Sequence, residues 1–157
     1  MPEETKSPGI LIVGIGNDYR SDDGAGLYVA RCIKRQNTKE VSVVSGIGDG
    51  TSLLDLWDNR EHAILIDSVS SGKPTGYIYK FDGLAEDISA ESFTSFSTHA
   101  VSIPDTIFLG KRLGRLPKKL TIYGIEGDDF RPGNELSRPV KDAAEKLVDE
   151  IIGILNE

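Results

Sequence analysis

Three side chains in this sequence could bind a divalent metal ion together: the carboxylates of Asp23 and Asp67 and the imidazole of His99. Asp67 directly follows the apolar run Ala63–Ile66. A carboxylate in such a place is costly to bury unless it is paired, hydrogen-bonded or bound to a metal. Carboxylate oxygens combined with an imidazole nitrogen suit borderline divalent ions such as nickel, zinc or cobalt. We therefore interpret the three residues as a candidate metal site.

Each acidic residue also has a purely structural explanation. Asp22 and Asp23 begin a helical pattern, and aspartate is a good N-cap; for Asp22 this explanation is sufficient. Asp67 could form a local turn with the serines that follow it. The segment Asp49–Thr51 either caps a helix or brings a further carboxylate to the cleft. These alternatives stay open at the level of the residues alone.

The turn Gly14–Asn17 lies between a predicted strand and a predicted helix, as a dinucleotide-binding turn would. The fingerprint G-x-G-x-x-G requires glycine at position 19, where the sequence has Tyr19. Asp22 and Asp23 would also repel a pyrophosphate at the N-terminus of the helix. A tight turn explains the glycines better, and nucleotide binding stays a competing interpretation.

The elements that position these residues alternate between short apolar runs and helical patterns, which is typical of a parallel sheet with crossover helices. We predict a central strand over 10–13, further strands over 41–44, 63–66 and 120–125, and an edge strand over 76–81. Helices are predicted after Asp23, after Thr51 as the N-cap, over 101–112 and over 140–155. The long polar segment 84–98 is of a length that is usually functional or mobile.

Ligands of open α/β sheets bind outside the carboxyl ends of the strands. The segments that follow the predicted parallel strands each contain Asp or Glu, and they are 14–23, 45–51, 67–70 and 124–131. The sequence therefore predicts that its candidate carboxylates meet at one edge of the sheet.

Composition excludes several other classes of protein. The chain has 157 residues, 25 acidic and 18 basic, with a net charge of −7, so nucleic acid is an unfavourable partner. One cysteine, Cys32 on the apolar stripe of a helix, excludes a disulfide framework and a cysteine-based zinc finger. His62, in a polar turn, is expected to be exposed to solvent. The N-terminus resembles no signal peptide and no apolar run approaches the ~20 residues of a membrane span, so we expect a cytoplasmic protein with no membrane partner.

The sequence resembles the hydrogenase maturation endopeptidases over nearly its whole length. The resemblance lies in motifs that occur in the family's order: Gly14-x-Gly16-Asn17-x-x-Arg20-x-Asp22-Asp23-Gly24-x-Gly26, Asp49-Gly50-Thr51, Ile66-Asp67-Ser68 and Ser97-x-His99-x-x-Ser102. Such enzymes have a three-layer α/β/α sandwich around a twisted, mostly parallel five-stranded sheet. The resemblance implies that residues 1–157 form one domain of this kind.

The resemblance also implies an activity. Enzymes of this family are aspartic-type endopeptidases that remove a C-terminal extension from the precursor of the large subunit of a nickel–iron hydrogenase. Cleavage follows nickel insertion, so the substrate supplies the nickel and no tightly bound cofactor is expected. The precursor is the expected partner, and the free enzyme is expected to be a monomer. The competing interpretations are a small-ligand or nucleotide-binding domain without peptidase activity, and a different hydrolase with a resident zinc.

Carried over by motif, the metal ligands are Asp23, Asp67 and His99, and the candidate catalytic residue is Asp49. Many members of the family have Glu where this chain has Asp23, whose side chain is one methylene shorter. The remaining motif positions are expected to bind substrate: Gly16, Asn17, Gly50, Thr51 and Ser97.

Overall fold

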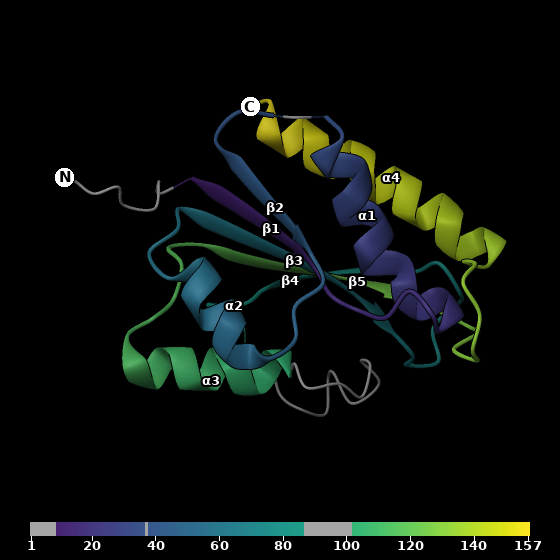
Figure 1. Cartoon of the computed structure of the whole chain (residues 1–157), viewed down its shortest axis with the longest axis horizontal. Coiled ribbons are helices and arrows are strands. Elements are labelled where there is room, and N and C mark those ends of the chain that lie inside the picture. The colour runs from purple at the N-terminus through teal and green to yellow at the C-terminus, as the bar shows by residue number, and fades with distance from the viewer. Residues whose placement is uncertain (1–8, 37, 87–101) are drawn as a thin grey trace.

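The computed structural model of the chain describes residues 9–36, 38–86 and 102–157. Strands and helices alternate along the described residues (Figure 1). In chain order they are β1 (Ile10–Gly14), the 3-10 helix η1 (Ser21–Gly24), α1 (Ala25–Lys34), β2 (Val41–Ser45), α2 (Gly50–Trp57), β3 (His62–Val69), β4 (Ile78–Asp82), α3 (Ile103–Leu113), β5 (Leu120–Glu126) and α4 (Arg138–Leu155).

The five strands form one sheet in the order β2-β1-β3-β5-β4. Neighbouring strands are parallel except β4, which pairs with β5 in the antiparallel sense at the edge. Helices α1 and α4 cover one face of the sheet, and α2 and α3 cover the other (Figure 1). The predicted three-layer α/β/α architecture is confirmed, although β3 rather than β1 is the middle strand.

Each face of the sheet carries its own hydrophobic core, because side chains alternate along a strand. In β1, Leu11 and Val13 face α2 and α3, whereas Ile12 faces α1 and α4. All three are fully buried. Burial on both faces is what the continuous apolar runs in the sequence predict for parallel strands.

Two differences from the sequence prediction concern the candidate site residues. Strand β3 continues beyond the apolar run to Val69, so Asp67 lies within the strand and is paired with Gly124 of β5. Helix α2 is capped by Asp49 and not by Thr51: the Asp49 carboxylate accepts a hydrogen bond of 2.8 Å from the Ser52 amide. Asp67 therefore belongs to a regular element, whereas Asp49 lies in the connection between β2 and α2.

His62 is not exposed, contrary to the sequence prediction. It is the first residue of β3, is partly buried, and places Nε2 2.8 Å from Oγ1 of Thr121. Burial lowers the pKa of His62, and the charges of Lys119 and Lys80 lower it further.

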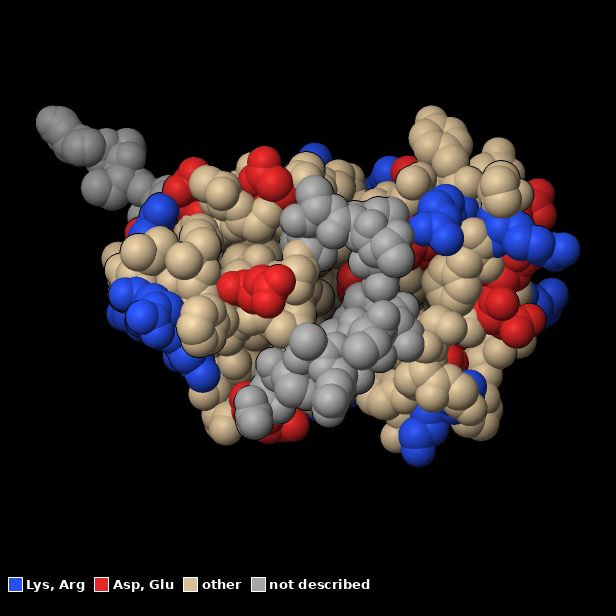
Figure 2. Space-filling model, turned by 90° about the horizontal axis from the view of Figure 1, so that it is seen from below, with Lys and Arg blue, Asp and Glu red and all other residues tan. Residues whose placement is uncertain are grey.

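The face covered by α2 and α3 carries charges of both signs (Figure 2). Lys and Arg gather toward the two ends of this face, with Asp and Glu beside them. Ion pairs such as Arg115–Asp55 and Lys118–Glu61 are largely exposed, so each contributes little to stability. In the described residues no helix combines the length and the apolarity needed to cross a membrane.

Glycines allow the backbone of α1 to approach the backbone of the sheet directly. A Cβ on Gly14 would lie 2.4 Å from the carbonyl oxygen of Gly26, and a Cβ on Gly26 would lie 2.2 Å from the carbonyl oxygen of Ile66. Backbone atoms cannot move aside as a side chain can, so either methyl group would push α1 away from β1 and β3.

Substitution of Gly26 tests this contact. Gly26→Ala should lower the free energy of unfolding by about 1–3 kcal/mol, the usual range for overpacking. Gly153→Ala is the matched control in α4, where an added Cβ meets nothing within 4 Å, and it should raise that free energy by up to ~1 kcal/mol. Urea unfolding measures both. If Gly26→Ala left the free energy of unfolding unchanged, α1 could shift away from the sheet at no cost, and the close contact would not be a constraint.

Acidification tests the environment of His62. Because its pKa is lower in the folded chain, the unfolded chain binds more protons below about pH 6.5, the usual pKa of histidine. The contribution of neutral His62 is complete above that pH and is lost as the pH falls toward the folded pKa. Between about pH 8 and about pH 5.5, His62→Gln should therefore lose less unfolding free energy than the parent chain. Equal losses of unfolding free energy in the variant and the parent chain would contradict the partly buried position of His62.

Candidate active site

Asp23 and Asp67 meet at the carboxyl ends of β1 and β3. Asp23 comes from η1, which follows β1, and Asp67 comes from β3 itself. The chain passes from β1 to β2 on one side and then returns to β3 on the other. This reversal of strand order is where open α/β sheets bind their ligands. The sequence prediction that these two carboxylates lie together is confirmed.

Ser68 links the two carboxylates. Its amide donates a hydrogen bond of 2.7 Å to Oδ1 of Asp67, and its hydroxyl donates one of 2.7 Å to Oδ1 of Asp23. Ser68 is itself 1% exposed. Sequence reasoning placed Ser68 in a motif but did not assign it this role, because the second bond joins residues that are 45 positions apart.

The electrostatics of the pair favour a cation. Asp23 is 0% and Asp67 2% exposed. Burial raises the pKa of Asp67 well above its usual range, and the charge of Asp23 raises it further, whereas the Ser68 amide acts in the opposite direction. Two like charges in a buried place destabilise one another, and a cation between them relieves both the repulsion and the desolvation. The donor set therefore fits a divalent metal.

The other predicted ligand and one predicted substrate-binding residue, His99 and Ser97, lie outside the described residues. Within the described ranges, no group of three or more His, Cys, Asp or Glu is placed to hold a metal. The described part of the chain thus supplies two carboxylates of the three ligands that the sequence predicts.

Gly16 and Asn17 wrap around the backbone of Asp23. Gly16 has φ 146°, and a Cβ there would lie 2.1 Å from the carbonyl oxygen of Asp23 and 4.0 Å from Oδ1 of Asp67. The Asn17 amide donates to the same Asp23 oxygen at 3.2 Å. Close approach to Asp23 therefore explains the glycine of this turn without a nucleotide.

Asp22 is not a helix cap, contrary to the sequence prediction. It is fully buried, and Oδ2 accepts hydrogen bonds from the amides of Asp128 and Asp129 at 2.9 and 3.0 Å. Oδ1 accepts from the Ser137 amide at 2.7 Å. These bonds fasten the segment 127–137 to η1, so Asp22 builds one wall beside Asp23. The partners lie more than 100 residues away in sequence, and no local pattern signals them.

The Asp49–Thr51 turn lies after β2, on the far side of β1 from Asp67. Asp49 is exposed, and hydrogen bonds from the backbone and the side chain of Ser52 lower its pKa. Thr51 is exposed in the first turn of α2, and a Cβ on Gly50 would lie 2.7 Å from Oγ1 of Thr106. The turn is thus held between α2 and α3, with the Asp49 carboxylate ionised at neutral pH.

Known proteins resemble this chain in sequence. The family model for hydrogenase maturation proteases matches residues 27–154. The hydrogenase 2 maturation protease of Escherichia coli K12 is 26% identical over 152 residues, covering 94% of this chain and 91% of the relative. A putative hydrogenase maturation protease of Methanocaldococcus jannaschii is 30% identical over 156 residues, covering 94% of this chain and 97% of the relative.

Solved structures resemble the chain as well. The hydrogenase-maturating endopeptidase HybD from E. coli has a TM-score of 0.79 at 24% identity, covering 94% of this chain and 92% of that one. A hydrogenase 2 maturation peptidase from a Thaumarchaeota archaeon has a TM-score of 0.67 at 29% identity, covering 94% and 98%. The first comparison shows the shared fold. The second shows a similar fold in a protein whose sequence identity to this chain is higher.

Neutralisation of one carboxylate tests the charge repulsion in the pair. The pKa of Asp67 is raised by folding, so its ionised form destabilises the native chain above its usual pKa. Asp67→Asn should therefore raise the free energy of unfolding at neutral pH by about 1–3 kcal/mol. The parent chain should gain stability from added Ni²⁺, which binds the native state, and Asp67→Asn should lose that gain.

Asp22→Asn is the matched control, since it also neutralises a buried aspartate. Its amide group would face backbone N–H donors, so it should lower the free energy of unfolding by about 1–3 kcal/mol and keep the gain from Ni²⁺. Equal behaviour of the two variants in urea unfolding would contradict the distinct roles of the two aspartates.

Proposed function

This chain belongs to the hydrogenase maturation protease family, and from that premise we propose that it removes the C-terminal extension of a nickel-loaded hydrogenase large-subunit precursor. The observation that carries the proposal is the buried pair Asp23–Asp67, joined through Ser68 at the reversal of strand order. A peptidase that reads a metal on its substrate needs anionic ligands that become favourable only when that metal arrives. The burial of both carboxylates and the raised pKa of Asp67 support this role for the pair.

In the proposed reaction the precursor brings nickel held by its own thiolates. Asp23, Asp67 and His99 complete the coordination of the ion, so the metal serves as the recognition signal and the enzyme needs no tightly bound cofactor of its own. Because the substrate carries the ion, an unloaded precursor offers the pair no cation and binds weakly. We further propose that the free enzyme is a monomer and acts in the cytoplasm.

Hydrolysis requires an activated water, and we propose that Asp49 is the general base. The water oxygen attacks the carbonyl carbon of the scissile bond while one of its protons passes to the Asp49 carboxylate. The C–N bond then breaks and the proton passes to the leaving amine. Gly16, Asn17, Gly50, Thr51 and Ser97 are proposed to hold the peptide along the cleft. The lowered pKa of Asp49 makes it a weak base, so polarisation of the carbonyl by the substrate's nickel is the alternative source of activation.

Incubation with a nickel-loaded precursor tests the proposal, with mass spectrometry of the precursor's C-terminus as the readout. The parent enzyme should remove the extension from the loaded precursor and leave the nickel-free precursor intact. Asp49→Asn should bind the precursor but cleave it about 10²–10⁴ times more slowly. Asparagine caps helices as well as aspartate does, so α2 keeps its start. His99→Ala should bind the loaded precursor no better than the nickel-free one.

Asp142→Asn serves as the control because Asp142 is exposed on α4, paired with Arg138. It should process the precursor at the parental rate. Full cleavage by Asp49→Asn would remove Asp49 from catalysis, and normal processing by His99→Ala would end its assignment as a ligand. Failure of the parent enzyme to cleave any loaded precursor would overturn the proposed function.

A further inference from the structure

The two edge strands of the sheet, β2 and β4, differ in how well they are protected from pairing with another chain. Native edge strands usually carry charged residues or proline, which discourage further pairing. Strand β4 follows this rule with Lys80 and Asp82, and the Asp82 amide donates a hydrogen bond of 2.9 Å to the Glu86 carboxylate. Strand β2 has the sequence Val-Ser-Val-Val-Ser, without charge or proline, and its residues are all partly buried. It is therefore an edge that is suited to accept a further strand.

The outer side of β2 presents a regular row of backbone groups. In a parallel pair, successive residues direct their amide and carbonyl groups alternately toward the neighbouring strand and away from it. The Gly46 amide donates to the Gly14 carbonyl at 2.8 Å. The Glu40 carbonyl accepts from the Ile10 amide at 3.3 Å, so the even-numbered residues of this segment face β1. The odd-numbered residues face outward, where no described strand pairs with them: Val41, Val43 and Ser45.

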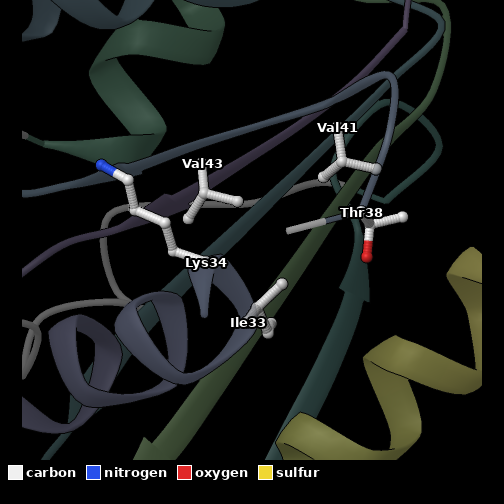
Figure 3. Close-up of a pocket in the computed structure, with 5 residues that line it drawn as sticks. All are labelled: Ile33, Lys34, Thr38, Val41 and Val43. Atoms are coloured by element: carbon white, nitrogen blue, oxygen red, sulfur yellow. The ribbon is translucent and has the colours of Figure 1, made fainter. Parts of the chain in front are cut away.

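A pocket lies beside the same row, on the face of the sheet that α1 covers (Figure 3). It has a volume of about 150 Å³, and Ile33 of α1 lies opposite Val41 and Val43 of β2. The other two lining residues are polar, Lys34 and Thr38. Residues paired with Val41 or Val43 would point their side chains to this face. An engineered cavity of about this volume holds a benzene molecule, so the pocket has room for one aliphatic side chain of an added strand.

The edge of β2 also leads to the carboxylate pair. Ser45, at the carboxyl end of β2, is level with Gly14 of β1. Gly14 is level with Ile66 of β3, the residue before Asp67. Because neighbouring strands lie about 4.8 Å apart, a strand added to β2 lies three spacings, ~14 Å, from β3, and about four or five extended residues span that distance. The turn of Asp49, the proposed general base, follows β2, so a substrate that runs from Asp67 past Asp49 continues toward this edge.

We propose that the C-terminal extension of the precursor binds the outer edge of β2 as an added antiparallel strand. The inference rests on the proposed function and names the part of the substrate that this edge holds. The nickel holds the mature side of the scissile bond, and a bond is oriented for reaction when the groups on both of its sides are held. The extension begins at that bond and runs from the carboxyl end of β2 toward its amino end. Backbone hydrogen bonds supply the affinity of such an added strand.

Proline substitutions in the extension test the pairing without changing the enzyme. In an antiparallel pair only every second residue exchanges hydrogen bonds with its neighbour, and proline has no amide to donate. Nickel-loaded precursors with single prolines, placed in turn from about the fifth to about the tenth extension residue, should therefore alternate in kcat/KM. Every second substitution should lower it about 5- to 10-fold, the effect of one lost hydrogen bond. A uniform response along the series would overturn the inference.

Val43→Pro tests the same pairing from the side of the enzyme. Val43 is the middle residue of β2 and its amide faces outward, so proline removes a donor to the extension and no bond to β1. Lys80→Pro, the matched control, changes the middle residue of β4. The Gly83 amide donates to the Leu120 carbonyl of β5, so the even-numbered Lys80 also faces outward. The readout is the ratio of kcat/KM for the whole extension to kcat/KM for an extension cut to about four residues, which stops short of the edge.

The parent enzyme should favour the whole extension at least about 10-fold, because the short one forms no strand. Val43→Pro should lower this ratio about 5- to 10-fold, and Lys80→Pro should leave it at the parental value. Urea unfolding checks that both variants are folded, and the proline series decides the inference even if Val43→Pro fails to fold. Equal rates for the two extensions with the parent enzyme would overturn the inference, as would an unchanged ratio in folded Val43→Pro or an equal loss in Lys80→Pro.

A second copy of this chain would compete for the same edge, and sedimentation distinguishes it from the extension. A parent chain that sediments as a dimer, with Val43→Pro as a monomer, would assign β2 to self-association and overturn the inference. Two monomers agree with it. Normal cleavage without alternation in the proline series leaves the proposed function standing, whereas absence of cleavage for every loaded precursor would overturn the proposed function, and this inference with it.

Discussion

The backbone contact between the η1–α1 segment and the ends of β1 and β3 is the constraint on which the candidate site depends. Gly16 meets the carbonyl oxygen of Asp23, and Gly26 meets that of Ile66, at distances that no Cβ could occupy. Because no side chain separates these backbones, Asp23 is carried to within reach of Ser68 and Asp67. The fold thus forces two carboxylates together that would otherwise avoid one another.

This arrangement sets stability against function. The packing on both faces of the sheet is that of an ordinary α/β protein, with large apolar side chains fully buried. At the carboxyl edge the same packing holds the Asp67 carboxyl away from water, which raises its pKa and disfavours its ionised form. Proteins keep such unfavourable groups where a ligand later relieves them. In the proposed function the relieving ligand is the metal that the substrate carries. The free enzyme is therefore the less stable state, and substrate binding stabilises the two carboxylates.

The sequence predicted the architecture well because apolar runs and helical periods are local signals. It also predicted that Asp23 and Asp67 converge, since Asp23 follows β1 and Asp67 lies near the carboxyl end of the neighbouring parallel strand β3. It failed where the partners are distant: Asp22 bonds residues about 106 to 115 positions away, and His62 meets Thr121 59 positions away. The sequence predicts an end of β3 that is too early, because the apolar run stops at Ile66 while the pairing of β3 with β5 continues to Val69. The role of His99 stays a prediction.

The bonds of Asp22 also determine when the site is finished during synthesis. A ribosome makes the chain from its N-terminus, and the candidate ligands Asp23 and Asp67 emerge in its first half. The wall beside them closes only when residues 128, 129 and 137 reach the Asp22 carboxylate. A nascent polypeptide that has not yet reached residue 137 therefore carries Asp23 and Asp67 without the complete set of hydrogen bonds that fastens the neighbouring wall to Asp22.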